Sequence, residues 1–136
     1  MHKKPTLLAA MTPFPHAIDL HAPVQDAAAM MAHHEIRHLP VTDSNALVGI
    51  VSARDLAEHE AGNWLVADVY RGDPYVVEAD FPLEAVLQTM ATRHLGAVII
   101  TRHGRLAGIM TTVDVCRTFA VHLRTIYPEP PDDEAA

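Results

Sequence analysis

An internal repeat constrains the fold of this chain more than any other feature of its sequence. When the 136 residues are shifted by 59 positions, the distance from Gly49 to Gly108, many identical residues coincide without a gap. The coinciding pairs are Pro15 and Pro74, Pro23 and Pro82, Met31-Ala32 and Met90-Ala91, Thr42 and Thr101, Leu47 and Leu106, Gly49-Ile50 and Gly108-Ile109, and Asp55 and Asp114. Self-similarity at one fixed spacing is the signature of a duplicated structural unit. We therefore expect two copies of one small unit rather than a single larger domain.

Both copies have the same predicted order of elements, β-α-β-β-α. A short extended segment comes first (16–20 and 75–79), and a helix that begins at a proline follows it (23–34 and 82–93). Proline suits the first turn because the N–H that it lacks has no helical partner there. Two short apolar strands joined by a polar turn come next (38–42 with 47–52, and 97–101 with 106–110), and a second helix ends each copy. The predicted fold class is α+β, with a tail at 1–10, a first unit at 11–60, a linker at 61–69, a second unit at 70–127 and a disordered acidic tail at 128–136.

Composition limits the partners that such a chain can have. The chain carries 10 Lys and Arg against 17 Asp and Glu, a formal net charge of −7, and four of the acids lie between residues 129 and 134. This balance provides no general attraction to nucleic acid or to an anionic membrane, and no apolar run reaches the length of a membrane span. The single cysteine, Cys116, excludes an internal disulfide. We expect a soluble cytoplasmic protein in which Cys116 is a small buried side chain of the last helix.

The repeated motif Gly-x-x-Ser/Thr-x-x-Asp carries the candidate chemistry. It runs from Gly49 to Asp55 and again from Gly108 to Asp114, at the end of a strand and the start of a helix. A hydroxyl at the N-cap can face a phosphate or a sugar, and a carboxylate one turn later can accept two hydrogen bonds from a vicinal diol. The same spacing is also that of a helix capping box, which would need no ligand. Its occurrence in both copies favours a ligand-binding function.

Residues 11–119 resemble a tandem pair of CBS domains, the small module named after cystathionine beta-synthase. The resemblance rests on Met11-Thr12-Pro13, on the segment Arg37-His38-Leu39-Pro40-Val41, and on both Gly-x-x-Ser/Thr-x-x-Asp motifs. It implies a pseudo-two-fold arrangement of the units with two clefts between them. It also implies regulation rather than catalysis: a stand-alone protein that binds AMP, ADP, ATP or S-adenosylmethionine, forms a homodimer and signals to a protein partner that the sequence does not identify.

The resemblance also implies roles for particular residues. In the first cleft Asp55 takes the ribose hydroxyls, and Ser52, Arg37 and His38 face ribose or phosphate. The predicted adenine contacts are Ile50, Tyr75 and Leu95, with Tyr70 near the edge of the ring. The second cleft is predicted to contain Thr111, Asp114, Ile109, Ile36 and His16, with Met11 and Thr12 near its base. Gly96-Ala97 replace Arg37-His38 in the second copy, so we expect the Asp55 cleft to prefer a phosphorylated adenosine and the Asp114 cleft to be weaker, empty or suited to S-adenosylmethionine.

Two alternatives stay open at this point. The first is a dimerisation scaffold whose clefts bind nothing. The second is a zinc hydrolase, because His34-Glu35-Ile36-Arg37-His38 matches the H-E-x-x-H pattern. That chemistry needs both histidines on one helical face. Since Pro40 follows His38 closely and the repeat places His38 at the start of a strand, we expect no metal site there.

Overall fold

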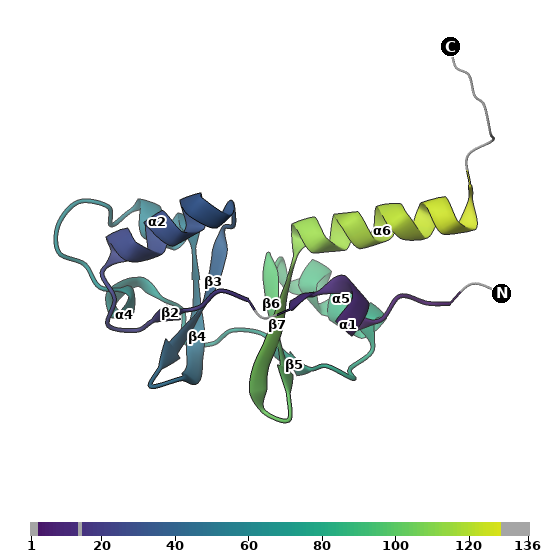
Figure 1. Ribbon diagram of the computed structural model, residues 1–136, viewed down its shortest axis with the longest axis horizontal. Coiled ribbons are helices and arrows are strands. Elements are labelled where there is room, and N and C mark those ends of the chain that lie inside the picture. Colours follow the sequence, from purple (N-terminus) through teal and green to yellow (C-terminus); the bar gives the residue numbers. More distant parts are fainter. Residues whose placement is uncertain (1–2, 14, 129–136) are drawn as a thin grey trace, which may run out of the picture.

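The two predicted copies fold as two units that lie side by side. The computed structural model describes residues 3–13 and 15–128. Its elements are α1 (Leu7–Ala10), β1 (Thr12–Pro13), β2 (Ile18–Asp19), α2 (Val24–His34), β3 (His38–Asp43), β4 (Ala46–Ser52), α3 (Ala53–Ala57), α4 (Val66–Val69), β5 (Val76–Glu78), α5 (Leu83–Arg93), β6 (Ala97–Arg102), β7 (Arg105–Thr111) and α6 (Thr112–Ile126). Figure 1 shows the hairpins β3–β4 and β6–β7 adjacent to each other at the centre of the molecule. The predicted order β-α-β-β-α is confirmed in both units.

Each unit is a small sheet with helices packed against it. In the first, β2 runs parallel to β3 and β3 pairs antiparallel with β4; in the second, β5 runs parallel to β6 and β6 pairs antiparallel with β7. Both hairpins have a register shift at the same repeat position, between Val41 and Thr42 and between Ile100 and Thr101. The repeat therefore extends to the irregularities of the strands.

The first helices of the two units also begin and end alike. Pro23 and Pro82 are the N-caps of α2 and α5, so each helix begins one residue after the predicted proline. Each helix ends at a residue with left-handed backbone, Glu35 at φ 56° and His94 at φ 55°. A left-handed residue after the last turn is a common helix terminator because it lets the final carbonyls find backbone donors.

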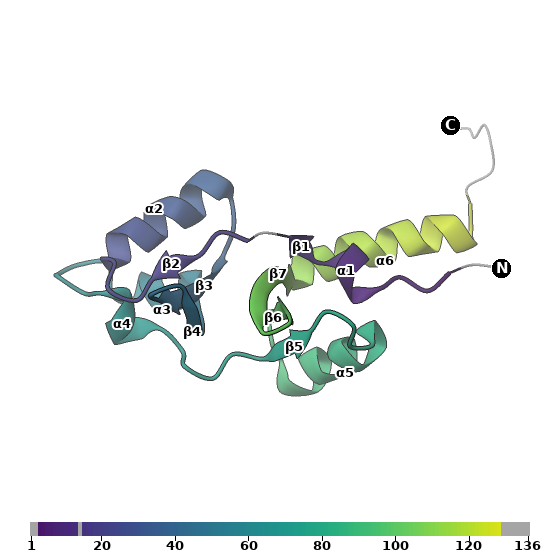
Figure 2. The same cartoon turned by 60° about the horizontal axis from the view of Figure 1, so that its bottom comes forward.

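The predicted N-terminal tail is partly wrong, because residues within 1–10 belong to the second unit. Leu7 and Ala10 are only 1% and 5% exposed, in the same core as Met110, and β1 pairs with β7. Figure 2 shows the chain passing α1 and β1 beside β7 before it enters the first unit. No local pattern reveals this packing, since its partners lie about a hundred residues away.

The glycine of each repeated motif permits an equivalent close approach in both units. Arg71 forms a backbone bridge with Ile50, with N···O distances of 2.8 and 3.0 Å, just as Thr12 pairs with Ile109. A Cβ on Gly49 would overlap the carbonyl oxygen of Arg71 and the ring of Tyr70, and a Cβ on Gly108 would overlap the Met11 sulfur. The absent side chain therefore makes room for the segment that precedes each unit.

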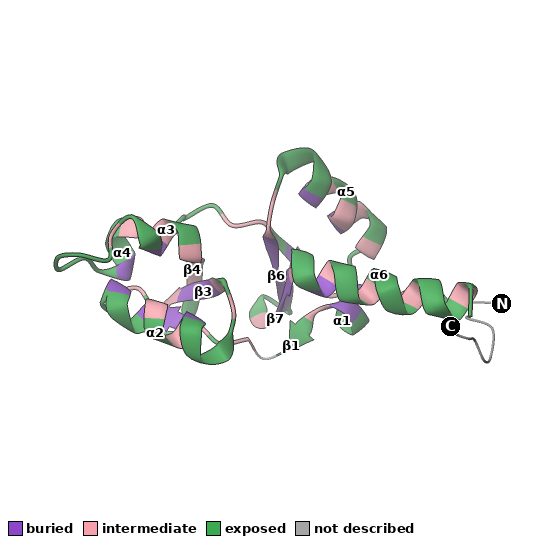
Figure 3. Cartoon of the chain, turned by 90° about the horizontal axis from the view of Figure 1, so that it is seen from above, coloured by how far each residue is buried: buried purple, intermediate pink, exposed green. Residues whose placement is uncertain are grey.

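The final helices differ more than the repeat predicts. Helix α3 has 5 residues, whereas α6 has 15 and buries Asp114 alone of its residues. Cys116 is exposed, so the prediction that it lies buried on the inner side is wrong. Figure 3 shows that much of α6 is exposed along its length. The predicted acidic tail lies, from residue 129 onward, outside the described residues. Across the described ranges, no helix has the length and apolar character needed to cross a bilayer.

Candidate functional site

Both repeated motifs form the capping boxes that their spacing predicts. The Ser52 hydroxyl accepts a hydrogen bond from the Asp55 backbone N–H at 3.2 Å, and Asp55 Oδ2 accepts one from the Ser52 N–H at 2.9 Å. Thr111 and Asp114 repeat this exchange at 3.4 and 2.9 Å. One oxygen of each carboxylate therefore serves the start of a helix. The other oxygen, Oδ1, remains for further contacts.

The segment before each unit supplies a donor to that second oxygen. Arg71 Nε lies 3.3 Å from Asp55 Oδ1, and Thr12 Oγ1 donates to Asp114 Oδ1 at 3.1 Å. Arg71 and Thr12 occupy equivalent positions in the repeat. Asp114 Oδ1 has an additional donor, Arg117 Nη1 at 3.0 Å. The two carboxylates are similarly buried, at 9% and 7% side-chain exposure, but their donors differ.

A cavity of about 440 Å³ lies around Asp55 and is lined by both units. Six of its lining residues are predicted site residues: Arg37, His38, Ile50, Ser52, Asp55 and Leu95. The other six are Ala53, Arg54, Arg71, His94, Gly96 and Ala97. Its volume lies within the range typical of small-molecule sites. The structure thus gathers most of the predicted first cleft around one opening.

The lining of this cavity is strongly cationic. It contains three arginines, two histidines and a single carboxylate, although the whole chain carries a net charge of −7. Arg54, Arg71 and His94 were not predicted from the sequence. Arg54 lies inside the repeated motif, and Arg71 is the repeat counterpart of Thr12, so the offset of 59 residues could have pointed to both. His94 ends α5 and reaches the cavity only through the packing of the two units.

His38 lies at the junction of the units. A Cβ built on Gly96 would meet His38 Nε2 at 3.3 Å, so the imidazole packs closely on the backbone of the second unit. Its Nδ1 is buried and has no hydrogen-bond partner in the described part of the chain. Burial lowers the pKa of His38, the Asp55 carboxylate opposes that shift, and the Arg37 guanidinium adds to it. A buried imidazole of this kind is held in its neutral form.

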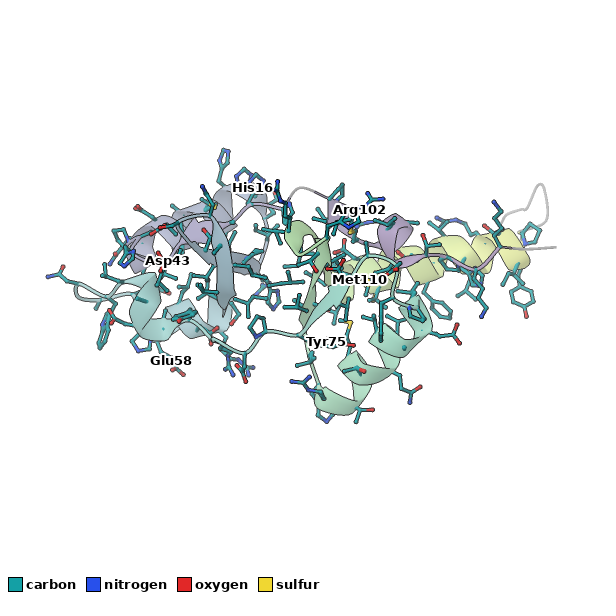
Figure 4. All side chains as sticks on the ribbon, turned by 90° about the horizontal axis from the view of Figure 1, so that it is seen from below. His16, Asp43, Glu58, Tyr75, Arg102 and Met110 are labelled. Carbon is teal, nitrogen blue, oxygen red and sulfur yellow. The ribbon has the colours of Figure 1, made fainter. Side chains whose placement is uncertain are left out.

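Two predicted adenine contacts, Tyr70 and Tyr75, are not among the described residues that line this cavity. Tyr70 packs on the first core, beside Gly49. Tyr75 packs on the second core, with the Arg93 guanidinium 5.7 Å from its ring centroid, and Figure 4 shows it just before β5. Their roles toward adenine stay untested predictions.

Several residues of the predicted second cleft contact one another. Thr12, Ile109, Thr111 and Asp114 come together through the pairing of β1 with β7 and the hydrogen bonds to Asp114. Met11 lies beside Gly108. Ile36 packs against the first core, and the His16 ring stacks on His34 with centroids 3.6 Å apart; Figure 4 shows His16 on the first unit. The ligand roles of these residues stay predictions.

The H-E-x-x-H segment does not have zinc-protease geometry. Helix α2 ends at His34, Glu35 has left-handed backbone, and His38 begins β3. Within residues 3–13 and 15–128, no three His, Cys, Asp or Glu side chains are placed to hold a metal ion together. The two histidines of the motif therefore do not share a helical face, as the zinc-hydrolase alternative requires.

Comparison with known proteins agrees with this architecture. The CBS domain family model matches residues 7–62 and 66–121. A curated relative, inosine-5'-monophosphate dehydrogenase of Korarchaeum cryptofilum, is 33% identical over 93 residues, which make up 68% of this chain and 20% of that enzyme. The chain spans about a fifth of the length of the first curated relatives that it matches. The alignment therefore covers a small part of the larger proteins.

Two solved structures match nearly their whole length. A proposed acetoin utilization protein (AcuB) of Vibrio cholerae is 27% identical with a TM-score of 0.80, and the match covers 94% of this chain and 100% of that one. CBSX2, solved in complex with AMP, is 26% identical with a TM-score of 0.76, over 89% of this chain and 99% of that one. The chain belongs to the CBS domain family and is a tandem pair of CBS domains.

Proposed function

We propose that this chain binds a phosphorylated adenosine of the AMP, ADP or ATP class in the cleft around Asp55. Ligand binding in that cleft then regulates a protein partner or a second copy of the chain. The observation that carries the proposal is the cationic lining of the 440 Å³ cavity. Three guanidiniums around one carboxylate are suited to a ligand with several negative charges, because arginine forms charge-assisted, often paired hydrogen bonds with phosphate.

Each group of side chains in the lining is suited to one part of such a ligand. Asp55 Oδ1 is the oxygen that accepts hydrogen bonds from ribose hydroxyls, since Oδ2 is engaged in the capping box. Arg37 and His38 face the phosphates, with each charge-assisted bond contributing about 1.5–3 kcal/mol where water is excluded. Ile50 and Leu95 provide apolar contact for adenine. The AMP complex of CBSX2 supports adenosine as the nucleoside.

The cleft around Asp114 is proposed to be weaker for phosphorylated ligands. Gly96 and Ala97 stand at the repeat positions of Arg37 and His38, and Val113 stands at that of Arg54. Asp114 Oδ1 is held by both Thr12 and Arg117. An uncharged or cationic adenosine such as S-adenosylmethionine suits this cleft better than ATP does.

Thermal unfolding in the presence of AMP, ADP, ATP, NADH or S-adenosylmethionine tests the proposal. A ligand at 100 times its Kd adds about 2.7 kcal/mol to the free energy of unfolding, which shifts Tm measurably. We expect the phosphorylated adenosines to raise Tm of the wild type and not that of D55A. If none of the five compounds changes Tm, the clefts bind none of them and the chain is a scaffold.

That scaffold is the second candidate, and helix α6 favours it. Val113, Cys116, Ala120, Leu123 and Tyr127 recur at heptad spacing, and all are exposed. Apolar residues repeated in this way are typical of a helix that packs on another helix.

We propose a homodimer in which this face meets the same face of a second copy. Sedimentation equilibrium on the wild type and L123E checks it: we expect a dimer that the buried charge of L123E dissociates, and a monomeric wild type contradicts it.

A further inference from the structure

We propose that Arg71 determines the ligand specificity of the first cleft by competing with ribose for Oδ1 of Asp55. A ribose hydroxyl reaches this buried oxygen by displacing the guanidinium that covers it, and a phosphate in the same cavity then gives the guanidinium a new partner. The cleft therefore favours phosphorylated nucleosides over neutral ones by more than charge attraction alone provides. This inference rests on the proposed nucleotide site.

The competition follows from the limited access to Asp55 Oδ1, because the carboxylate is buried and the exposed Arg71 side chain lies on it. Its Oδ2 accepts the Ser52 N–H at 2.9 Å and cannot leave without opening the capping box. Its Oδ1 is 3.3 Å from Arg71 Nε. The carboxylate is 9% exposed, whereas the Arg71 side chain is 66% exposed. A ligand that enters the cavity therefore meets a buried acceptor covered by a solvent-exposed donor.

The backbone of Arg71 is anchored, whereas its side chain is largely exposed to solvent. Its N–H and carbonyl both bond to Ile50 in β4, at 2.8 and 3.0 Å. Arg71 also lines the cavity together with Arg37 and His38, the groups proposed to face phosphate. Rotation about its side-chain bonds can thus move the guanidinium from the carboxylate toward phosphate without changing the pairing of the strands.

The second repeat lacks an arginine at the position equivalent to Arg71. Thr12 takes the place of Arg71, and its short hydroxyl carries no charge to offer a phosphate. The arginine on Asp114 comes instead from α6, as Arg117. The repeat counterpart of Arg117 is Glu58, labelled in Figure 4, which cannot donate to Asp55. Arg71 is thus the one side-chain donor to Asp55 Oδ1 among the described residues.

Opposite changes in affinity distinguish competition from simple attraction. In R71A, neutral adenosine no longer has to displace a guanidinium, so we expect its affinity to rise about 3-fold, since the lost ion pair is partly exposed to solvent. The affinity for ATP should fall about 10-fold or more, because a charge-assisted phosphate contact is lost. An arginine that acted only through its charge would leave adenosine binding unchanged.

Calorimetric titration of wild type, R71A and R54A with adenosine and ATP performs the test. R54A is the matched control, because Arg54 lines the same cavity and, within the described part of the chain, forms no side-chain hydrogen bond to Asp55. It should weaken the binding of ATP and leave the affinity for adenosine unchanged. A rise for adenosine with a fall for ATP in R71A alone supports the inference. Weaker or unchanged adenosine binding in R71A overturns it, while the proposed function stands if wild type binds ATP. If wild type binds neither compound, the proposed function itself fails and the inference fails with it. Should R71A not fold, R71M removes the charge and keeps an unbranched apolar stem.

Discussion

The two clefts of this molecule have the same frame and different linings. Each has a Gly-x-x-Ser/Thr-x-x-Asp capping box and a preceding segment whose residue bonds to the carboxylate. Around Asp55, however, the lining carries three arginines, whereas the repeat counterparts of those arginines are Gly96, Val113 and Thr12. The duplicated backbone therefore preserves the geometry for ribose, and the side chains that vary between copies decide which charge each cleft accepts.

The largest expected difference between the clefts is the effect of removing the carboxylate. D55A should weaken ADP and ATP binding at least about 100-fold, because two charge-assisted hydrogen bonds to ribose are lost at about 1.5–3 kcal/mol each. D114A is the control, since it removes the equivalent capping box and carboxylate in the other unit. Isothermal titration checks both variants. Equal losses of ATP affinity in D55A and D114A would mean that the two clefts share one ligand preference.

The two motif glycines should also differ in how much stability is lost when a methyl group is added, with the larger loss at Gly49. In G49A the new Cβ meets the Arg71 carbonyl oxygen and the Tyr70 ring, neither of which can yield easily, so we expect a loss of about 1–3 kcal/mol in unfolding free energy. In G108A the nearest atom is the Met11 sulfur, at the flexible end of a side chain, although the Thr12 carbonyl lies 2.9 Å away. Chemical denaturation should therefore find G108A the more stable variant. A more stable G49A would contradict this account of the close approach.

The sequence predicts these frames well because their causes are local or repeated. The offset of 59 residues, the prolines before α2 and α5 and both capping boxes are visible without tertiary information. The burial of Leu7 in the second core and the contact of Arg71 with Asp55 depend on packing between distant segments. The exposure of Cys116 was missed for the same reason: the repeat equates it with Ala57, yet α3 and α6 have 5 and 15 residues and face different surroundings.

A smaller effect is expected from transferring a charge between the clefts. T12R places a guanidinium at the repeat position of Arg71, on a backbone that pairs with Ile109 as Arg71 pairs with Ile50. Measured in a D55A background, which silences the first cleft, T12R should raise ATP affinity about 10-fold, the value of one charge-assisted contact that is partly exposed. T12V in the same background is the control, because it removes the hydroxyl bond to Asp114 without adding charge. ATP binding that is equally weak in both variants would show that the second cleft cannot be converted by charge alone.

The smallest expected effect is a pH dependence that arises from His38, which has no titratable counterpart in the second unit. Burial lowers the pKa of His38 below its ordinary value of 6.5, and its counterpart Ala97 does not titrate. The unfolded chain then binds a proton at His38 more readily than the folded chain does. The contribution of neutral His38 to the free energy of unfolding is therefore complete above pH 6.5 and is lost as the pH falls below it. The Arg37 guanidinium also disfavours the imidazolium, whereas Asp55 favours it.

A phosphate beside His38 should reverse the sign of this pH dependence for binding, because an anion favours the imidazolium. We expect ATP affinity to rise modestly between pH 7.5 and about pH 6 while Tm of the free protein falls. In H38Q, both the ATP affinity and Tm should depend less on pH. The pH dependence that remains comes from the other titratable groups, such as the surface histidines. Calorimetry in two buffers of different ionisation enthalpy measures the proton taken up with the ligand. If wild type and H38Q take up the same number of protons, the phosphate lies away from His38 and the cationic side of the cleft is formed by its arginines alone.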